Sequence, residues 1–326
     1  MKIVAAVIGM GVGEKHLEAI DGFIGSKVKI ICEKNKKKIK ILKKKYPNKI
    51  ITSNEEDIFT DKQINLVSLA SYDNYHYSQI LKCFKYNKNI IVEKPMCLTL
   101  EELKKIKSIS KKSKVKIVSN LVLRENDLFK DFKKKINKKK IYYIEAAYIW
   151  GRPKKLFEWR SKIKNYSIIL GAAIHMIDLI MWFLEDKPKY VTSFGNDKFT
   201  KGTSFKKKNC VTLIIEFSSG IIAKINANSL AVHPHFHELK IFQKNKTFVH
   251  NLSGSYEHNK KKLIYNNKNY PDKENRKNLI RKFINNLKNN LNKNYMPIKE
   301  QFDLMSVCFA AEKSLISNKK IRINYL

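Results

Sequence analysis

Short apolar runs alternate with longer, lysine-rich amphipathic stretches over the first 120 residues of the chain. The apolar runs are β-branched and nearly continuous, which is typical of strands buried on both faces of a parallel sheet. The predicted strands are Ile3–Ile8, Val28–Cys32, Ile50–Thr52, Leu66–Ala70, Asn89–Val92 and Lys116–Ser119, with helices near 14–21, 35–46, 75–87 and 99–112 between them. Thr99 and Glu102 form the pattern of a capping box at the start of the last helix. Repeated βα units of this kind predict an α/β fold with a doubly wound parallel sheet.

The pattern changes after about residue 125. A long β-like run, Ile141–Trp150, precedes a helical pattern from about Leu170 to Leu184. Later segments are predicted as strands near 190–195, 211–217, 221–228, 236–243 and 246–250, helices near 274–291 and 300–316, and a last strand at Ile321–Asn324. Strands that follow one another without helices form a mostly antiparallel sheet. We therefore predict two domains, the α/β domain over residues 1–122 and an α+β domain with an open, mostly antiparallel sheet over residues 123–326.

Charge and composition restrict the classes of partner. The chain carries 66 Lys+Arg against 29 Asp+Glu, a formal charge of +37, and 43% of its residues are hydrophobic. This apolar content is sufficient for a core, so intrinsic disorder is not expected. Lysine triplets occur along the whole chain instead of clustering on one element, and arginine, the better reader of bases and phosphates, is scarce. We interpret the charge as solvated surface with a weak, salt-sensitive attraction to polyanions, and we expect no specific nucleic-acid partner.

The cysteines and the apolar segments indicate the compartment. Five scattered cysteines, none in a Cys-x-x-Cys pair, fit a reducing cytosol. No run approaches the roughly 18 apolar residues that a membrane span needs, and Ile3–Ile8 is too short for the apolar core of a signal peptide. We therefore expect a cytoplasmic protein without a membrane partner.

A glycine turn follows the first predicted strand as Gly9-Met10-Gly11-Val12-Gly13. Glycine permits positive φ and lets backbone N–H groups approach a pyrophosphate at the start of a helix. The dinucleotide fingerprint places its third glycine five positions after the first, where this chain has Glu14, so the loop is one residue short. The turn nevertheless predicts dinucleotide binding through Gly9, Gly11 and Gly13, with an ordinary tight turn as the alternative.

Glu33 lies at the end of the second predicted strand, 24 residues after Gly9. An acid at this place suits the ribose diol of NAD and repels a 2′-phosphate. The sequence therefore predicts NAD as the cofactor, with NADP disfavoured. The alternative is an ordinary exposed glutamate.

Glu93-Lys94-Pro95 directly follows the fifth predicted strand. Because an open α/β sheet binds ligands beyond the carboxyl ends of its strands, Lys94 is predicted to point to the cofactor crevice. Pro95 restricts Lys94 to an extended backbone. The alternative is one more surface lysine in a lysine-rich chain.

These motifs occur in a recognisable order: Gly9–His16, Tyr75-His76, Glu93-Lys94-Pro95 and Gly171–Asp178. Together they resemble the glucose–fructose oxidoreductase/inositol dehydrogenase (Gfo/Idh/MocA) family over nearly the whole chain. The resemblance implies an N-terminal Rossmann domain and a C-terminal domain whose open sheet forms oligomer contacts, hence a homo-oligomer, dimer or tetramer. It also implies NAD(P)-dependent oxidation or reduction of one secondary alcohol of a sugar or polyol.

The resemblance assigns roles to individual residues. Lys94 is implied at the substrate hydroxyl, with Glu93 supporting it and Pro95 shaping the nicotinamide side, and His76 is implied at the cofactor. Relatives with a complete acid–base set have an aspartate four residues before the catalytic histidine, but this chain has Gly171 four residues before His175. Proton transfer is therefore left to Lys94 and His175.

Asp178 is three residues after His175, so both lie on one face of the predicted helix. Asp178 could orient the imidazole or form only a local hydrogen bond. His175 itself has the alternative of being a buried core histidine.

Arginines and aromatic residues gather between residues 124 and 160, at Arg124, Tyr148, Trp150, Arg152, Trp159 and Arg160. They could line a sugar site for a substrate with an anionic substituent, because arginine binds carboxylate or phosphate bidentately. The alternative is a sheet edge with solvated arginines. His233, His235 and His237 alternate, as a metal site on a strand requires, but no cysteine or carboxylate completes the set. We therefore expect no metal, and we interpret these histidines as a sheet-face or interface cluster.

The leading functional prediction is an NAD(P)-dependent oxidoreductase. It would transfer a hydride between nicotinamide and a secondary alcohol of a sugar, a polyol or a nucleotide-linked sugar. One alternative is NAD-assisted elimination or glycoside cleavage, in which the cofactor is recycled. The other is a nicotinamide-binding regulator without turnover.

Overall fold

The computed structural model describes residues 2–260, 262–289 and 295–326, and the chain forms two compact units. The first unit comprises Met1–Val122 and Lys273–Phe302, and the second comprises Leu123–Asp272 and Asp303–Leu326. Among the described residues, no helix combines the length and the apolar character that crossing a membrane requires.

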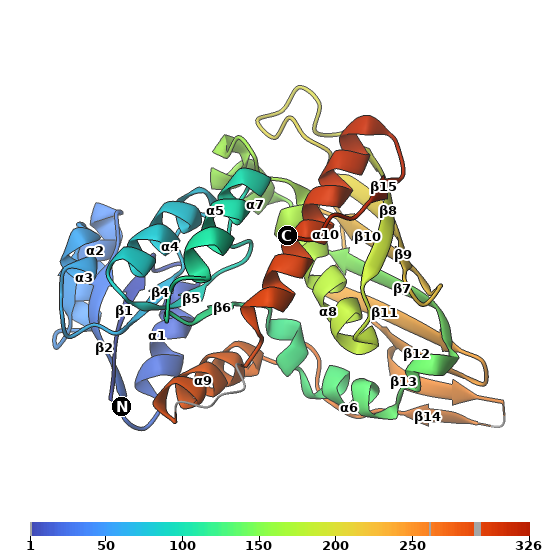
Figure 1. The fold of residues 1–326 in the computed structure, drawn as a ribbon, viewed down its shortest axis with the longest axis horizontal. Coiled ribbons are helices and arrows are strands. Elements are labelled where there is room, and N and C mark those ends of the chain that lie inside the picture. Colours follow the sequence, from blue (N-terminus) through green and yellow to red (C-terminus); the bar gives the residue numbers. More distant parts are fainter. Residues whose placement is uncertain (1, 261, 290–294) are drawn as a thin grey trace. The chain divides into compact units, whose positions relative to one another are not determined.

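A parallel sheet with the strand order β3-β2-β1-β4-β5-β6 forms the centre of the first unit (Figure 1). Its strands are β1 (Ile3–Ile8), β2 (Ser26–Cys32), β3 (Ile50–Thr52), β4 (Leu66–Leu69), β5 (Asn89–Val92) and β6 (Ile117–Ser119). Every strand pairing in this sheet is parallel, and β4 is buried over its whole length. The predicted doubly wound sheet is therefore confirmed.

Helices connect these strands near the predicted positions. They are α1 (Gly13–Asp21), α2 (Lys36–Lys45), α3 (Glu56–Phe59), α4 (His76–Lys85) and α5 (Leu100–Ser110). The capping box of α5 is confirmed: the side chain of Thr99 accepts from the Glu102 N–H, and Glu102 reaches back to the Thr99 N–H. The short helix α3 was not predicted.

The chain returns to the first unit with helix α9 (Asn275–Lys288), which packs on α1. The helix is amphipathic, and its apolar face is buried through Leu279, Ile280, Phe283, Ile284 and Leu287. Arg281 and Lys288 on α9 donate to the carbonyls of Gly22 and Ile24, at 2.9 and 2.7 Å. The predicted domain boundary between residues 122 and 123 therefore did not assign α9 to the first unit, where the structure has it. The last two residues of the helix predicted to run to 291 lie outside the described residues.

A sheet with the order β14-β13-β12-β11-β7-β10-β9-β8-β15 forms the second unit. Its strands are β7 (Ile141–Ile149), β8 (Pro188–Asn196), β9 (Cys210–Phe217), β10 (Ile222–Asn228), β11 (Phe236–Gln243), β12 (Lys246–Asn251), β13 (Gly254–Asn259), β14 (Leu263–Tyr265) and β15 (Ile321–Arg322). Only the pairing of β7 with β10 is parallel among the described strands of this sheet. The predicted α+β unit with a mostly antiparallel sheet is confirmed.

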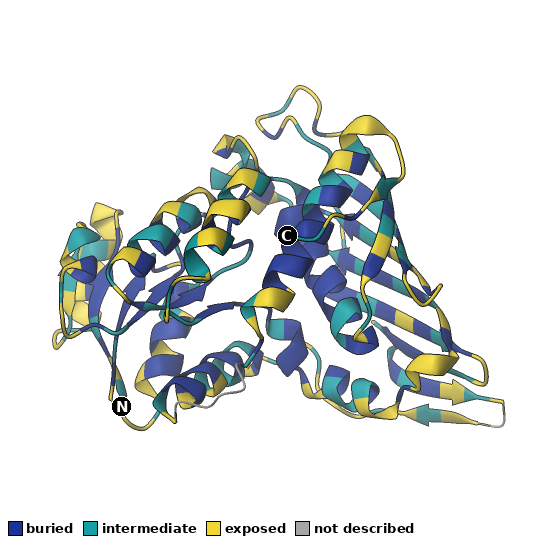
Figure 2. Ribbon diagram, viewed as in Figure 1, coloured by how far each residue is buried: buried dark blue, intermediate teal, exposed yellow. Residues whose placement is uncertain are grey.

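Helices cover one face of this second sheet (Figure 1). They are α6 (Asp127–Lys135), α8 (Ile174–Leu184) and α10 (Ile298–Ser317), whose residues from Asp303 onward belong to this unit. Burial alternates along β7 and β9, so one face forms the core while the other is partly exposed (Figure 2). Shorter helical segments are α7 (Lys154–Phe157), the turns Asp73–Tyr75, Val122–Glu125, Lys138–Lys140 and Trp159–Lys162, and the π turn Ile169–Ala173.

Candidate cofactor and active-site residues

The glycine turn at the end of β1 leaves room for only glycine at two positions. Gly9 has a φ of +87°, and a Cβ there would lie 2.5 Å from the Ala70 carbonyl oxygen. A Cβ on Gly13 would lie 2.9 Å from Val7 Cγ1, because α1 packs closely on β1. In the dinucleotide fingerprint, the third glycine allows the helix to pack closely on the strand. Gly13 allows the same close packing here, although it lies one residue before the fingerprint position. Gly11 has no described atom within 4 Å of the place of a Cβ, so its backbone faces open space that suits a pyrophosphate.

Glu33 is buried at the end of β2 and is bonded to the glycine turn. Its carboxylate accepts from the N–H groups of Met10 and Asn35, both at 3.0 Å, and Lys38 Nζ lies 3.8 Å from Oε2. A carboxylate has about four acceptor positions, so these bonds leave capacity for a ribose diol. The alternative of an ordinary exposed glutamate does not describe Glu33.

Glu93 is the centre of a polar network that no pattern in the sequence predicts. Its Oε1 lies 3.0 Å from Nε2 of His16, accepts from Asn120 Nδ2 at 2.5 Å, and lies 3.7 Å from Nε of Arg276. His16 is fully buried on α1, and its other ring nitrogen lies 2.7 Å from the hydroxyl of Ser68. The network therefore joins β5, α1, the residue after β6, and α9.

This network keeps Glu93 ionised. Burial by itself would raise the pKa of the Glu93 carboxyl, but the hydrogen bond and charge of His16 outweigh it, with help from Arg276 and Asn120. The pKa of Glu93 is consequently held well below its usual range. A fixed anion thus stands next to Lys94 in the chain.

Lys94 is half-buried beyond the carboxyl end of β5, and its peptide bond to Pro95 is cis. His76 is fully buried, with Nδ1 2.7 Å from the Pro95 carbonyl oxygen and Nε2 3.2 Å from that of Ser71. His76 therefore holds the backbone after Lys94 from inside the unit. This placement favours a supporting role over direct contact with a cofactor.

His175 of the second unit belongs to a cluster of aromatic rings from three elements. It lies on α8, and its ring stacks on Tyr148 of β7, with centroids 5.7 Å apart and an interplanar angle of 6°. His237 of β11 lies edge-on to both rings, at 4.6 Å from Tyr148 and 6.2 Å from His175. His235 contacts Tyr148 at 5.3 Å.

The predicted array of three histidines on one face of a strand is wrong for two members. β11 begins at Phe236, so His233 and His235 both precede the strand and only His237 lies on it. The His235 ring still lies 5.2 Å from that of His237, whereas Nδ1 of His233 lies 2.7 Å from the Pro234 carbonyl oxygen. Within the described ranges, no group of three or more His, Cys, Asp or Glu side chains is placed to hold a metal ion.

Buried groups anchor this ring cluster from behind. The Tyr270 hydroxyl forms a hydrogen bond with Nδ1 of His237, and burial raises the pKa of Tyr270 well above its usual value. His250, whose ring is 4.3 Å from that of Tyr270, has its pKa lowered to about 4 by burial. His250 is therefore neutral at physiological pH, and the wall behind His237 carries no charge from these two groups.

Arg124 and Asp178 pair with each other. Nε of Arg124 donates to both carboxylate oxygens of Asp178, at 3.1 and 3.0 Å, and a terminal nitrogen donates to Oδ1 at 2.6 Å. Both side chains are buried. Arg124 is therefore not a solvated arginine at a sheet edge. This ion pair links the turn before α6 to helix α8. It is joined to α8 through Asp178, three residues after His175.

Asp178→Asn is expected to lower the stability of the second unit by about 3 kcal/mol or more, because it removes the negative charge from a buried ion pair with Arg124. Urea unfolding followed by tryptophan fluorescence measures this loss, since Trp150, Trp159 and Trp182 all belong to the second unit. The double variant Arg124→Met/Asp178→Leu, which removes both charges, is the control and should recover part of the loss. A stable Asp178→Asn protein with kcat as low as that of a His175 variant would instead assign Asp178 to proton transfer.

Arg160 is the arginine that lies among the aromatic rings. Its guanidinium carbon is 4.1 Å from the ring centre of Trp159, 4.8 Å from that of Trp150 and 6.0 Å from that of Tyr166. Trp150 is buried, whereas Arg152 is exposed. Of the two predicted substrate residues on this loop, the structure thus brings Trp150 into the ring cluster, next to Tyr148.

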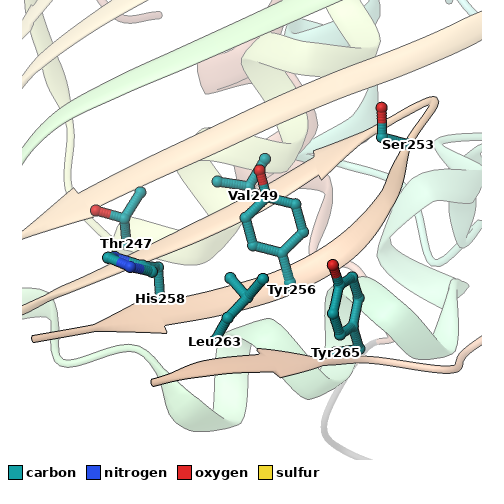
Figure 3. Close-up of a pocket in the computed structure, with 7 residues that line it drawn as sticks. All are labelled: Thr247, Val249, Ser253, Tyr256, His258, Leu263 and Tyr265. Carbon is teal, nitrogen blue, oxygen red and sulfur yellow. The ribbon is translucent and has the colours of Figure 1, made fainter. Parts of the chain in front are cut away.

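A separate pocket of about 500 Å³ lies on β12, β13 and β14 (Figure 3). Its lining is Thr247, Val249, Ser253, Tyr256, His258, Leu263 and Tyr265. Phe248 packs on Phe132 of α6, so Thr247 and Val249 point to the opposite face of the sheet. The pocket is therefore on the face away from the helices, and His175 does not line it.

Comparisons with known proteins agree with the two-unit architecture. Residues 3–121 match the model of an oxidoreductase family with an NAD-binding Rossmann fold, and residues 140–249 match the GFO/IDH/MocA C-terminal domain. Together these matches cover well over half of the chain.

Curated relatives are distant. The myo-inositol 2-dehydrogenase of Thermotoga maritima is 21% identical over 76% of this chain and 75% of its own length. The Bacillus subtilis protein YteT is 24% identical over 51% of this chain, and the match spans 41% of YteT, so the chain covers less than half of this relative. The matches also include Bacillus subtilis scyllo-inositol 2-dehydrogenases named for NADP+ and for NAD+.

Among solved structures, the myo-inositol 2-dehydrogenase of Lactobacillus plantarum aligns with a TM-score of 0.85. The alignment covers 99% of this chain and 100% of that one, at 18% identity. At this identity the likeness shows a common fold.

Proposed function

Because the chain belongs to the Gfo/Idh/MocA family of oxidoreductases, we propose that it is an NAD(P)-dependent dehydrogenase acting on a secondary alcohol of a sugar or polyol. The observation that carries this proposal is Lys94, placed at the carboxyl end of the parallel sheet directly after an anchored, ionised Glu93. Ligands of open α/β sheets bind at that edge. The glycine turn and Glu33 supply the cradle for a dinucleotide at the same edge.

When bound, the cofactor supplies the hydride acceptor or donor. The side chains of the protein supply proton transfer and orientation. Oxidation of a carbinol requires a base that takes the hydroxyl proton as the hydride leaves carbon, and we assign this task to Lys94 and His175. The Glu93 carboxylate is held by its contacts with Arg276, His16 and Asn120. These contacts fix the backbone directly before Lys94.

We propose a cyclic polyol or sugar as the substrate class. Several relatives are named inositol dehydrogenases, which supports this class. In the second unit, His175, Tyr148 and Trp150 provide flat rings with polar edges, and Arg160 adds a cation among them. A polyhydroxylated ring with an apolar face and several hydrogen-bonding groups suits such a surface.

A substrate screen tests the proposed function. The purified protein is incubated with NAD and a panel of inositols, free sugars, sugar acids and nucleotide-linked sugars, and NADH absorbance is followed. Steady accumulation of NADH with one class supports the dehydrogenase. Product formation without net NADH would identify NAD-assisted elimination or glycoside cleavage, and tight NAD binding without any product would identify a regulator.

The cofactor preference gives a separate prediction. Wild-type protein is expected to use NAD in preference to NADP, because the buried Glu33 carboxylate repels a 2′-phosphate. Glu33→Ala should lower the ratio of kcat/KM for NAD to that for NADP by about tenfold or more, equivalent to roughly 1.4 kcal/mol.

Glu33→Gln is the matched control for this prediction. The amide keeps one acceptor oxygen for the Met10 N–H and removes the charge, so it separates repulsion from loss of the brace on the glycine turn. A wild-type protein that prefers NADP would show that the assignment of Glu33 is wrong.

A further inference from the structure

Arg160 is a half-buried cation among aromatic rings. It lies on the turn Trp159–Lys162, and its guanidinium carbon is 4.1 Å from the ring centre of Trp159 and 4.8 Å from that of Trp150. Tyr166, at 6.0 Å, is 1% exposed and Trp150 is 6% exposed, so rings take the place of water on this side of the charge. Taking a cation out of water costs free energy unless an anion or hydrogen-bond acceptors compensate it.

Most of the donors of Arg160 are available to a ligand. A guanidinium has five N–H donors in a planar fork. In the part of the chain that the structure describes, its one side-chain hydrogen bond runs from a terminal nitrogen to the Lys155 carbonyl oxygen, at 3.3 Å, and no carboxylate lies within ion-pair distance. Glu158, the single acid between residues 151 and 166, is exposed. The charge of Arg160 is therefore without a counter-charge among the described side chains.

Other arginines of the chain are in different situations. Arg124 is paired with Asp178 in a buried ion pair, and Arg276 of the first unit faces Glu93 at 3.7 Å. Arg152 is exposed. Arg160 thus combines a place among buried rings with an unmatched charge.

The backbone of Arg160 is held in place from the following residues. Lys207 Nζ donates to the carbonyls of Ile163 and Tyr166, at 2.9 and 2.7 Å, directly after the turn. The Ile163 N–H donates to the Arg160 carbonyl at 3.2 Å. Because this backbone is fixed before a ligand arrives, binding to Arg160 costs little ordering entropy.

Ring contacts connect Arg160 to His175 within the second unit. Trp150, which contacts the guanidinium, lies edge-on to Tyr148 with ring centroids 6.3 Å apart. Tyr148 in turn stacks on His175, with centroids 5.7 Å apart. Two rings therefore stand between the guanidinium and the imidazole to which we assign proton transfer.

We propose that Arg160 binds an anionic substituent of the substrate, a carboxylate or a phosphate, and so narrows the substrate class to acidic sugars. The planar fork of arginine pairs bidentately with either group. The substrate would present its reacting hydroxyl to His175 and its anionic group to Arg160. This inference rests on the proposed function for the role of the ligand as a substrate, whereas binding of the anion does not require turnover.

A binding experiment with matched sugars tests the inference. Tryptophan fluorescence is followed while wild-type protein with NAD is titrated at about 0.15 M salt, which screens exposed charges. The probes are D-glucuronate against D-glucose, D-galacturonate against D-galactose, and glucose 6-phosphate against glucose. At least one acidic probe should bind about tenfold or more tightly than its neutral counterpart. If no acidic probe binds more tightly than its counterpart, the inference is wrong.

Arg160→Gln should remove this preference. Its affinity for the acidic probe should fall by about tenfold or more, while affinity for the neutral counterpart stays at the wild-type value and shows that the site is intact. Arg160→Lys keeps the charge without the fork and should lose only part of the preference. An arginine that only fastens its turn through the rings would lower both affinities equally in either variant, and that result overturns the inference.

Lys162→Gln is the matched control. Lys162 is exposed on the same turn, so its replacement removes one positive charge outside the rings and should leave the preference unchanged. Equal losses in Lys162→Gln and Arg160→Gln would assign the preference to the diffuse charge of the chain and overturn the inference. An Arg160-dependent preference without any product in the substrate screen would reject the dehydrogenase and keep the anion site. NADH formation with neutral sugars alone, unchanged in Arg160→Gln, would do the reverse.

Discussion

Lys94→Met is expected to reduce kcat by about 10³-fold or more while NAD affinity stays largely unchanged. Methionine keeps an unbranched apolar side chain of similar length and removes the amine, which we assign to the reacting hydroxyl. The cofactor contacts proposed for Gly9, Gly11 and Glu33 do not involve this amine. Steady-state NADH formation measures kcat, and calorimetric titration measures NAD affinity.

Lys112→Met is the control for this variant. Lys112 is exposed in the same unit, so its replacement removes one of many surface charges and should leave both quantities at wild-type values. If Lys94→Met loses NAD affinity together with activity, Lys94 has a structural or cofactor role. Wild-type kcat in Lys94→Met would remove Lys94 from the mechanism.

His175→Ala is expected to lower kcat by about 10²–10⁴-fold, the usual range for loss of a positioned acid–base group. His175 is buried and stacked on Tyr148, so its replacement also opens a small cavity. His175→Gln should show the same loss of kcat with a smaller loss of stability, which separates chemistry from packing. His258→Ala, an exposed histidine on β13, is the control and should leave kcat unchanged.

The pH dependence of kcat decides between the two assignments of His175. The plot of kcat against pH for wild type should show apparent pKa values that belong to Lys94 and His175 as a pair. In His175→Ala, one of the pH-dependent slopes of this plot should disappear. A variant with wild-type kcat at every pH would show that His175 is a core histidine.

Local patterns in the sequence predicted the features that depend on neighbours in the chain. The buried strands of the first unit, the capping box of α5 and the glycine turn each need only a few consecutive residues, and all are present in the structure. The β13–β14 hairpin was missed because Gly254–Asn259 is mostly polar and its strand character comes from pairing with β12.

Contacts between distant segments were beyond these patterns. The partners of Glu93 come from His16, Asn120 and Arg276, and no spacing along the chain connects them. The absence of a carboxylate at Gly171 was visible in the sequence, but the Tyr166 side chain that fills the space next to it was not. Pairing of Arg124 with Asp178 likewise became apparent only when the turn before α6 and the helix α8 were placed together.

The position of α9 in the chain determines when the cofactor unit is complete during synthesis. Translation proceeds from the N-terminus, and domains generally fold as units while they emerge. In this protein the helix that covers α1 and carries Arg276 is translated after the whole nine-stranded sheet except β15. Until then, the apolar surface that α9 covers on α1 stays uncovered, and Glu93 lacks its arginine. A chain released before residue 275 would therefore have all six strands of the parallel sheet but an incomplete first unit. Such a chain would be a substrate for cellular protein quality control.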